Sequence, residues 1–213
     1  MDTKRVQKNH IMSKEEKLGF IEIIRRLPWL YAPMLKALRP YAKKFKSLVD
    51  IGCGDGYLLE LIHGKFSQLN LAGIDVDPFM IQQAKKLPFR FYKKRVEDFS
   101  SATDIIIANL ALHHFKNPKR ILKKLYSLSK HVLIVADQLR PSTVKELKKR
   151  LRMRNRMIGV KDVEYYKKSE EVSILEAYSK GEVVKMIKGL HIPYKIFFYD
   201  KDYYQRAVII FEK

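Results

Sequence analysis

The chain has 213 residues, 46% of them hydrophobic and 31% charged, a balance typical of one globular domain with a single core. No apolar run approaches the roughly 18 residues that span a bilayer, and the N-terminus lacks the apolar stretch of a secretory signal, so we expect a soluble, cytoplasmic protein. The net charge of +20 favours anionic partners, although surfaces rich in Lys and Arg are equally typical of heat-adapted proteins.

Residues 1–46 are expected to form a helical N-terminal cap. Apolar residues recur at helical spacing and the pattern breaks at Pro28 and resumes after Pro33. The residues on the apolar face are Leu18, Ile21, Ile24 and Leu27.

Residues 47–138 alternate between short β-branched runs and amphipathic stretches, which predicts parallel strands joined by helices. The expected strands are 47–52, 70–76, 89–95, 103–110 and 131–138, and the expected helices are 57–64, 78–86 and 117–129. The pair Asn117-Pro118 suits the cap and first turn of the last helix. Only a short connection fits between the third and fourth strands.

Residues 139–192 have helical character and are expected to form a lid over the substrate region. In their basic run one face carries cations and another carries apolar residues. The cationic face is Lys145, Lys148, Lys149, Arg152 and Arg156, and the apolar face is Val144, Leu147, Leu151 and Ile158. Such a helix suits an RNA backbone, an anionic membrane surface or an anionic acceptor, and it equally suits an ordinary lid with a solvated face.

Residues 193–213 form two β-rich runs around a turn near Lys201-Asp202, which predicts a C-terminal β-hairpin. The expected fold is therefore α/β, a doubly wound, Rossmann-like sheet of seven strands whose final strand is antiparallel.

The segment VDIGCGDG, residues 49–56, places three glycines between a hydrophobic strand and a helix. A turn at this point lets a ligand approach bare backbone. Asp50 precedes the glycines, and Asp75 closes the next strand, where a carboxylate can hold the hydroxyls of a ribose. The pattern predicts an adenosine-containing ligand. It disfavours NAD, because the third glycine comes one residue earlier than in GxGxxG.

These motifs resemble those of the class I S-adenosylmethionine-dependent methyltransferases. The resemblance covers residues 47–138, through VDIGCGDGYLLELI, LAGIDVDPFMIQQAKK and TDIIIANLALHHFKNP. It implies that S-adenosylmethionine is the cofactor and S-adenosylhomocysteine the product. It further implies that Asp50 and the loop of Gly52, Cys53, Gly54 and Gly56 surround the methionine end, that Asp75 holds the ribose, that Val76 packs on the adenine, and that Asn109 and Leu110 lie beneath the cofactor. The usual acid after the third strand is replaced by Arg95-Val96, so the Val96 backbone is our expected adenine contact. Cys53 is expected to fill space, without redox chemistry, and no metal is expected.

Three residues are candidates for catalysis. His113 and His114 follow the fourth strand, and Asp137 ends the fifth, so all three lie at the rim where open α/β sheets bind ligands. Either histidine could act as a general base, and Asp137 could orient a histidine or the substrate. The structural alternatives are a packed or capping histidine, a solvated histidine and a turn-forming aspartate.

The segment NLALHHF is similar to that of methyltransferases for small quinone, phenolic or lipid-like acceptors, and it lacks the Asn/Asp-Pro-Pro-aromatic motif of base amino methylation. We therefore expect a small, hydrophobic or phenolic acceptor with an O, N or C nucleophile. Tyr165, Tyr166 and Tyr178 could line its site or lie in the core. The alternatives are an RNA methyltransferase that uses the basic face, and a non-catalytic cofactor-binding partner protein. Nothing in the sequence indicates the oligomeric state.

Overall fold

The computed structural model describes residues 3–5, 12–158, 164–201 and 204–213. Seven strands form one sheet in the order β3-β2-β1-β4-β5-β7-β6. The strands are β1 (Ser47–Ile51), β2 (Asn70–Asp75), β3 (Arg90–Lys93), β4 (Thr103–Asn109), β5 (Ser129–Gln138), β6 (Lys195–Lys201) and β7 (Tyr204–Glu212). The first five strands are parallel, and β7 runs antiparallel between β5 and β6. The expected α/β Rossmann-like sheet is confirmed.

The helices also follow the expected order. They are α1 (Lys14–Arg25), α2 (Ala32–Ala42), α3 (Tyr57–His63), α4 (Pro78–Ala84), α5 (Pro118–Leu128), α6 (Val144–Ile158), α7 (Glu164–Glu176) and α8 (Lys180–Lys188), with 3-10 turns η1 (Pro28–Tyr31), η2 (Val96–Asp98) and η3 (Leu112–His114). Several expected elements are a residue or two longer than those observed, and the fifth strand starts two residues earlier, at Ser129.

Local sequence signals explain where several helices begin. Ser13 and Glu16 form a reciprocal capping box at the start of α1. The Asn117 side chain accepts a hydrogen bond from the Arg120 amide, and Pro118 occupies the first turn of α5, as the sequence predicted. Pro28 begins the short 3-10 turn η1, which separates α1 from α2.

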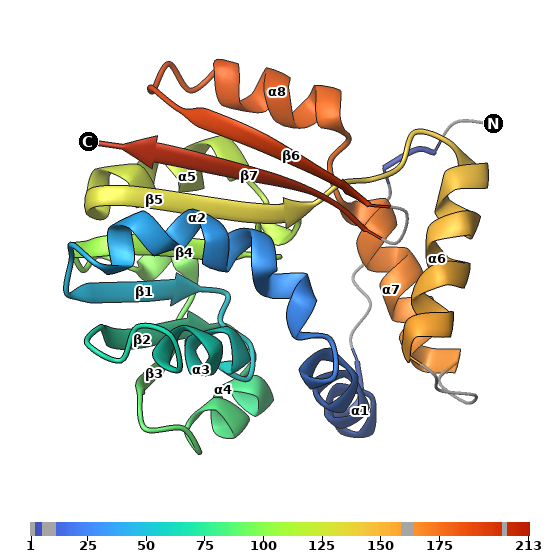
Figure 1. Cartoon of the computed structure of the whole chain (residues 1–213), viewed down its shortest axis with the longest axis horizontal. Coiled ribbons are helices and arrows are strands. Elements are labelled where there is room, and N and C mark those ends of the chain that lie inside the picture. Colours follow the sequence, from blue (N-terminus) through green and yellow to red (C-terminus); the bar gives the residue numbers. More distant parts are fainter. Residues whose placement is uncertain (1–2, 6–11, 159–163, 202–203) are drawn as a thin grey trace.

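Helices cover both faces of the sheet, and each face has its own apolar cluster. On one face α1, η1, α2, α3 and α4 pack on residues such as Leu48, Ile105 and Val208. On the other face α5 and α8 pack on residues such as Ile106 and Ile209. In Figure 1 the strands are stacked from β3 at the bottom to β6 at the top, with α2 in front of the sheet and α5 behind it. Alternate residues of each central strand therefore serve opposite layers, as a doubly wound sheet requires.

The region 139–192 divides between two positions. Helix α8 belongs to a layer of the sheet, because Val183, Met186 and Ile187 are buried against it. Helices α6 and α7 lie beyond the end of the sheet where β5 finishes and β7 begins (Figure 1). Only α6 and α7 are therefore placed beside the carboxyl ends of the parallel strands. The predicted hairpin joins β6 to β7, and the predicted turn residue Asp202 lies outside the described residues.

None of the helices in the described part of the chain is both long and apolar enough to cross a membrane.

Candidate functional site

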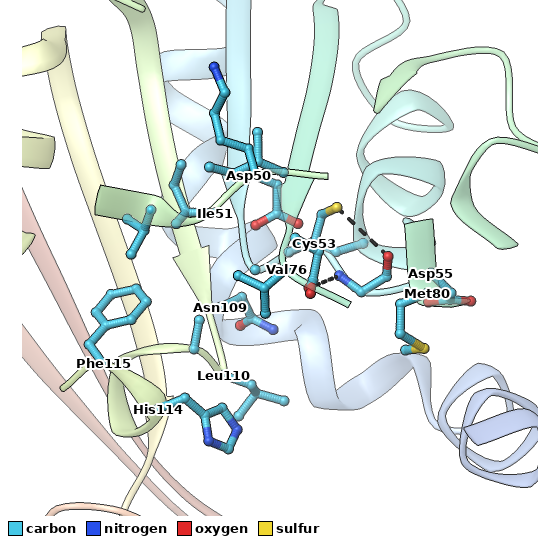
Figure 2. Close-up of a pocket in the computed structure, with 18 of the residues that line it drawn as sticks. Asp50, Ile51, Cys53, Asp55, Val76, Met80, Asn109, Leu110, His114 and Phe115 are labelled. Carbon is cyan, nitrogen blue, oxygen red and sulfur yellow. Dashed lines mark hydrogen bonds between the residues drawn. The ribbon is translucent and has the colours of Figure 1, made fainter. Parts of the chain in front are cut away.

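A cavity of about 700 Å³ opens at the carboxyl ends of β1, β2 and β4. Its walls come from the glycine loop, from the ends of β2 and β4, from η2 and from α1. The volume lies within the range of small-molecule and cofactor sites. Figure 2 shows the side chains of Asp50, Asn109 and His114 gathered around this space. Every predicted cofactor residue except Gly56 lines this cavity, and so does His114.

The glycine loop adopts backbone conformations that side chains resist. Gly52 has φ +75°, and a Cβ on it would lie 2.9 Å from the Cβ of Ala111. Gly56 has φ +81° and precedes the first turn of α3, where a Cβ would lie 2.8 Å from the Phe91 ring. Both positions need glycine because positive φ and close packing exclude a side chain. The loop therefore leaves bare backbone facing the cavity.

Cys53 lies inside this loop and is 7% exposed. Its sulfur packs against the backbone of β2, where a Cβ on Gly73 would lie 2.7 Å away. Burial, with the nearby charge of Asp50, raises the pKa of the Cys53 thiol. This geometry fits the expected space-filling role.

Asp50 is buried at the end of β1 and its Oδ1 atom has no hydrogen-bond partner in the described part of the chain. Burial, together with the charge of Asp75, raises the pKa of Asp50 to about 8. A buried carboxyl with an unpartnered oxygen beside an open cavity is a costly arrangement unless a ligand completes it, and a cationic ligand would favour its ionised form. The ammonium of S-adenosylmethionine is a donor of the right charge, so the site fits that cofactor.

Asp75 is held in place by the loop it faces. The Gly54 amide donates to its Oδ2 atom at 2.9 Å, and the Asp77 amide donates to its Oδ1 atom at 2.9 Å. Burial outweighs these hydrogen bonds and raises the pKa of Asp75. Each carboxylate oxygen has a second lone pair, so Asp75 can still accept from two ribose hydroxyls.

The remaining predicted cofactor residues also line the cavity. Val76 is 59% exposed at its edge, and Val96 begins η2 on the same side. Asn109 and Leu110 form the floor at the end of β4. Leu110 has φ +57°, an unusual conformation for leucine that is typical of functional sites. Its amide donates to Ala136 O at 2.8 Å, which fixes this strained turn.

One wall of the cavity was not predicted. Phe20, Ile21 and Ile24 of α1, with Tyr31 of η1, line the side opposite the end of β4. Arg25 fastens α1 to the glycine loop, because its Nε and Nη2 atoms contact Asp55 at 2.9 and 2.8 Å. The N-terminal cap is therefore part of the site, and its apolar periodicity was the signal that could have indicated this wall.

The three candidate catalytic residues occupy different environments. The His113 ring is 1% exposed, and its Nδ1 atom lies 2.8 Å from Asp137 Oδ1. The His113 amide also donates to Asp137 Oδ2 at 2.8 Å. Burial alone would raise the pKa of Asp137, but the charge and hydrogen bond of His113 outweigh burial and lower it. Among the residues that line the cavity, only His114 belongs to this group.

His114 projects from η3 at the rim of the cavity (Figure 2). Although 59% of its side chain is exposed, desolvation by the surrounding protein lowers the pKa of His114 to about 4, and the electrostatic effect of the neighbouring His113 adds to the shift. The ring is therefore neutral near pH 7 and can accept a proton. The His113 ring is also held from its other side. The Ser173 hydroxyl of α7 lies 3.3 Å from His113 Nε2, and Gln138 donates to the same hydroxyl at 2.6 Å.

His113, His114 and Glu176 have potential metal-ligating atoms within 4.8 Å of one another. Neighbouring ligands of a tetrahedral zinc site lie closer, at about 3.4 Å for bonds of about 2.1 Å. The His114 Nδ1 atom is 3.6 Å from the Glu176 carboxylate, and His113 Nδ1 is already bound to Asp137. The cluster would have to contract to hold a metal.

The basic helix α6 presents its predicted cations outward. Lys145, Lys148, Lys149, Arg152 and Arg156 are all exposed. Its buried face is less apolar than expected, because Arg150 and Arg154 are buried beside Leu147. The spacing of residues 147, 150 and 154 is helical and could have indicated these inward arginines. The side chains of Ile158, Tyr165 and Tyr166 lie outside the described residues, and Tyr178 is buried beneath Arg5 at 3.9 Å.

The sheet order, the antiparallel β7 and the glycine cradle at the end of β1 together define the class I S-adenosylmethionine-dependent methyltransferase fold. Residues 23–170 match the methyltransferase-domain family, and the chain belongs to that family. The family and the cofactor expected from the sequence are thereby confirmed.

The individual proteins that the chain resembles match it at low sequence identity. The malonyl-[acyl-carrier protein] O-methyltransferase of Anoxybacillus flavithermus is 30% identical over 86 residues, 38% of this chain and 33% of that protein. The carboxy-S-adenosyl-L-methionine synthase of Campylobacter lari is 26% identical over 190 residues, 82% of this chain and 76% of that protein. The first curated relatives are matched over a third to a half of their own length.

Among solved structures, the plantazolicin methyltransferase BpumL in complex with SAH superposes with a TM-score of 0.68 at 18% identity, covering 93% of this chain and 87% of that one. At this identity the likeness shows the fold, and it leaves the acceptor open.

Proposed function

We propose that the chain transfers the methyl group of S-adenosylmethionine to an O, N or C nucleophile of a small, hydrophobic or phenolic acceptor. The observation that carries the proposal is the composition of the cavity beyond the cofactor cradle. There Phe20, Ile21, Ile24 and Phe115 form an apolar side, and Lys94, Arg95 and Lys116 add charged side chains to the lining. We keep a single domain and a cytoplasmic location as predictions.

The cradle residues have distinct proposed roles. S-adenosylmethionine supplies an electrophilic methyl group when bound. Asp50 accepts its ammonium, the backbone of Gly52, Cys53, Gly54 and Gly56 surrounds its methionine end, and Asp75 accepts from the ribose hydroxyls. Val76 and Val96 flank the adenine, and Asn109 and Leu110 support the cofactor from below. Support comes from the lining of one cavity by Asp50, Asp75 and Asn109 and from the orphaned Asp50 oxygen.

For catalysis we propose that His114 removes a proton from the acceptor. Methyl transfer needs alignment above all, and a base contributes when the nucleophile arrives protonated. His114 lines the cavity and its pKa is lowered to about 4, so its ring is neutral at physiological pH. We assign His113 and Asp137 a positioning role, because both are buried and bound to each other.

Methyl-labelled S-adenosylmethionine incubated with separate metabolite, lipid, RNA and protein fractions tests this proposal. Label in the metabolite fraction is the expected result. Label in RNA alone would favour an RNA methyltransferase that uses the exposed cations of α6. Tight S-adenosylhomocysteine binding without a labelled product in any fraction would favour a non-catalytic cofactor-binding protein.

A further inference from the structure

Three arginines meet where α6 packs against β7. Arg150 and Arg154 point inward from α6, and Arg206 projects from the start of β7. Their exposed fractions are 4%, 6% and 1%. A buried guanidinium keeps its charge, so each needs acceptors to offset the lost hydration.

Two of the three arginines have such acceptors. Arg150 donates to Leu139 O at 2.6 Å and to Gln205 Oε1 at 2.5 Å. Arg154 forms an ion pair with the buried Glu170 of α7. These contacts tie α6 to the end of β5, to β7 and to α7.

Arg206 differs from both. All three of its guanidinium nitrogens are buried and without a hydrogen-bond partner in the described part of the chain. The centre of the Tyr204 ring lies 5.9 Å from the guanidinium carbon of Arg206. The negative charge of Asp137 acts on Arg206, but the Asp137 carboxylate is already bound to His113. Burial and the charge of Arg154 lower the pKa of Arg206 to about 10, so it is still a cation at pH 7. A buried, unpaired cation is strongly destabilising, which indicates a missing anion.

Arg206 does not itself line the cavity, but its position in the sheet brings it near the cavity wall. Arg206 lies opposite Gln138 in the β5–β7 ladder, at the carboxyl end of β5. Its neighbours Val208 and Ile210, two and four residues along, belong to the apolar cluster under η1, and side chains two apart in a strand share a face. Tyr31 of η1 lines the cavity, and its hydroxyl lies within the electrostatic field of Arg206.

We propose that Arg206 binds a carboxylate or phosphate group of the methyl acceptor. The proposal rests on the proposed function, because it assigns one end of the same acceptor. A guanidinium binds either anion through two parallel hydrogen bonds, and Arg206 has three free nitrogens for them. The acceptor is then amphiphilic. Its apolar body lies against Phe20 and Ile24 in the cavity, and its anionic end passes Tyr31 to reach Arg206, which lies beyond the residues that line the cavity.

Thermal unfolding with added anions tests the site. Sodium benzoate represents a carboxylate with an apolar body, inorganic phosphate represents the other anion, and sodium chloride at equal ionic strength is the reference. The wild-type Tm should rise by about 3 °C more than in chloride at roughly ten times the Kd of the bound anion. In Arg206→Met this anion-specific rise should vanish, and the variant's Tm in chloride should exceed that of the wild type by several degrees. No specific rise in the wild type, or an equal rise in Arg206→Met, would overturn the proposal.

Two matched variants exclude simpler explanations. Arg150→Met removes a buried arginine that has its acceptors, and it should lower the Tm in chloride. Arg152→Met removes an exposed cation of α6, and it should keep the anion-specific rise. If Arg206→Met does not fold, Arg206→Lys takes its place in the test. Lysine keeps the positive charge but cannot donate two parallel hydrogen bonds, so the affinity of this variant for benzoate should fall about tenfold. An unchanged benzoate affinity in Arg206→Lys would contradict bidentate binding.

Calorimetric titration of the same variants with S-adenosylhomocysteine separates the two proposals. The Arg206 variants should keep wild-type affinity for this ligand, since Arg206 is not among the cradle residues. Absence of cofactor binding in the wild type together with an intact anion effect would refute methyl transfer and leave the anion site standing.

Discussion

Asp50 shows how one buried carboxyl links cofactor binding to stability. Its folded-state pKa is raised to about 8, above the unfolded value near 4. Its contribution to stability is therefore fully present below about pH 4 and is lost as the pH rises through about 8. Burying the ionised carboxylate of Asp50 lowers the stability of the unliganded protein, and a bound cation offsets this cost. Asp50 therefore favours ligand binding at the expense of stability.

The substitution Asp50→Asn should separate these two effects. Without the carboxylate, the affinity for S-adenosylhomocysteine should fall about 10- to 100-fold, the value of a hydrogen bond to a charged group. The unliganded variant should unfold at a higher temperature than the wild type at pH 8. Calorimetric titration and thermal unfolding measure the two changes. Asp98→Asn, which removes an exposed carboxylate of η2, should alter neither. A variant with unchanged affinity would remove Asp50 from the cofactor site.

The proposed base makes a second prediction at this scale. His114→Ala should lower kcat by about 10²- to 10⁴-fold, the usual contribution of a general base, and should leave S-adenosylhomocysteine affinity unchanged. Because the pKa of His114 is lowered to about 4, wild-type kcat should persist down to about pH 5. An unperturbed histidine would lose activity near pH 6.5. The pH profile of kcat, with His63→Ala as a control, checks both statements. Full turnover in His114→Ala would show that alignment alone carries the reaction.

The sequence suggests candidate cofactor residues because each of them lies within a few positions of a glycine or a strand end, and their roles stay predictions. Asp50, Asp75 and Asn109 line one cavity as local spacing implied. Arg206 was not predicted, because it stands at the polar start of β7, before the continuous apolar run AVIIF, and nothing in that pattern indicates that it is buried. Its burial depends on α6 and η1, which are distant in sequence.

At the scale of elements, the turn between β1 and α3 depends on glycine for geometric reasons. In Gly56→Ala the new Cβ would have to accept φ +81° and a contact of 2.8 Å with the Phe91 ring. Left-handed backbone and overpacking together should cost about 2–5 kcal/mol. The Tm should fall by roughly 5–15 °C for a chain of this size. Thermal unfolding measures the change, and Gly181→Ala, where a Cβ meets nothing within 4 Å, is the matched control. Equal Tm values for the two variants would contradict the tight packing at Gly56.

The helices of residues 139–192 were predicted as a unit, and the structure separates them. The sequence could predict their helicity from periodicity. It could not predict that α8 packs on the sheet while α6 and α7 lie at its end, because periodicity does not indicate which surface a helix packs on. Contacts from other elements decide this, such as the hydrogen bond that Arg140 donates to Glu182 of α8 at 3.0 Å.

At the scale of the whole molecule, the charge of +20 has a measurable consequence. The five exposed cations of α6 should bind bulk RNA at low salt, and raising salt fourfold should weaken binding roughly 10²- to 10³-fold if each contacts one phosphate. Replacing Lys148, Lys149 and Arg152 with Gln should reduce the slope of log affinity against log salt by about 2–3. Filter binding at several salt concentrations measures this slope. RNA binding that ignores salt would contradict a purely electrostatic surface.

The sheet order was predictable at this scale and the acceptor was not. Five alternating units and a terminal hairpin leave few topologies, so the seven-stranded sheet followed from the pattern. The α1 wall of the cavity is held by contacts between residues far apart in the chain, such as those between α1 and α7, and local sequence patterns do not indicate them.

The position of β7 affects how the chain reaches its native state. Residues Tyr204–Glu212 lie between β5 and β6, and β6 pairs with β7 alone among the described strands. Synthesis on the ribosome must therefore reach Glu212 before β5 gains its second neighbour and β6 gains any. Until then the apolar edge of β5 is exposed, and a nascent chain in that condition is a natural client for chaperones.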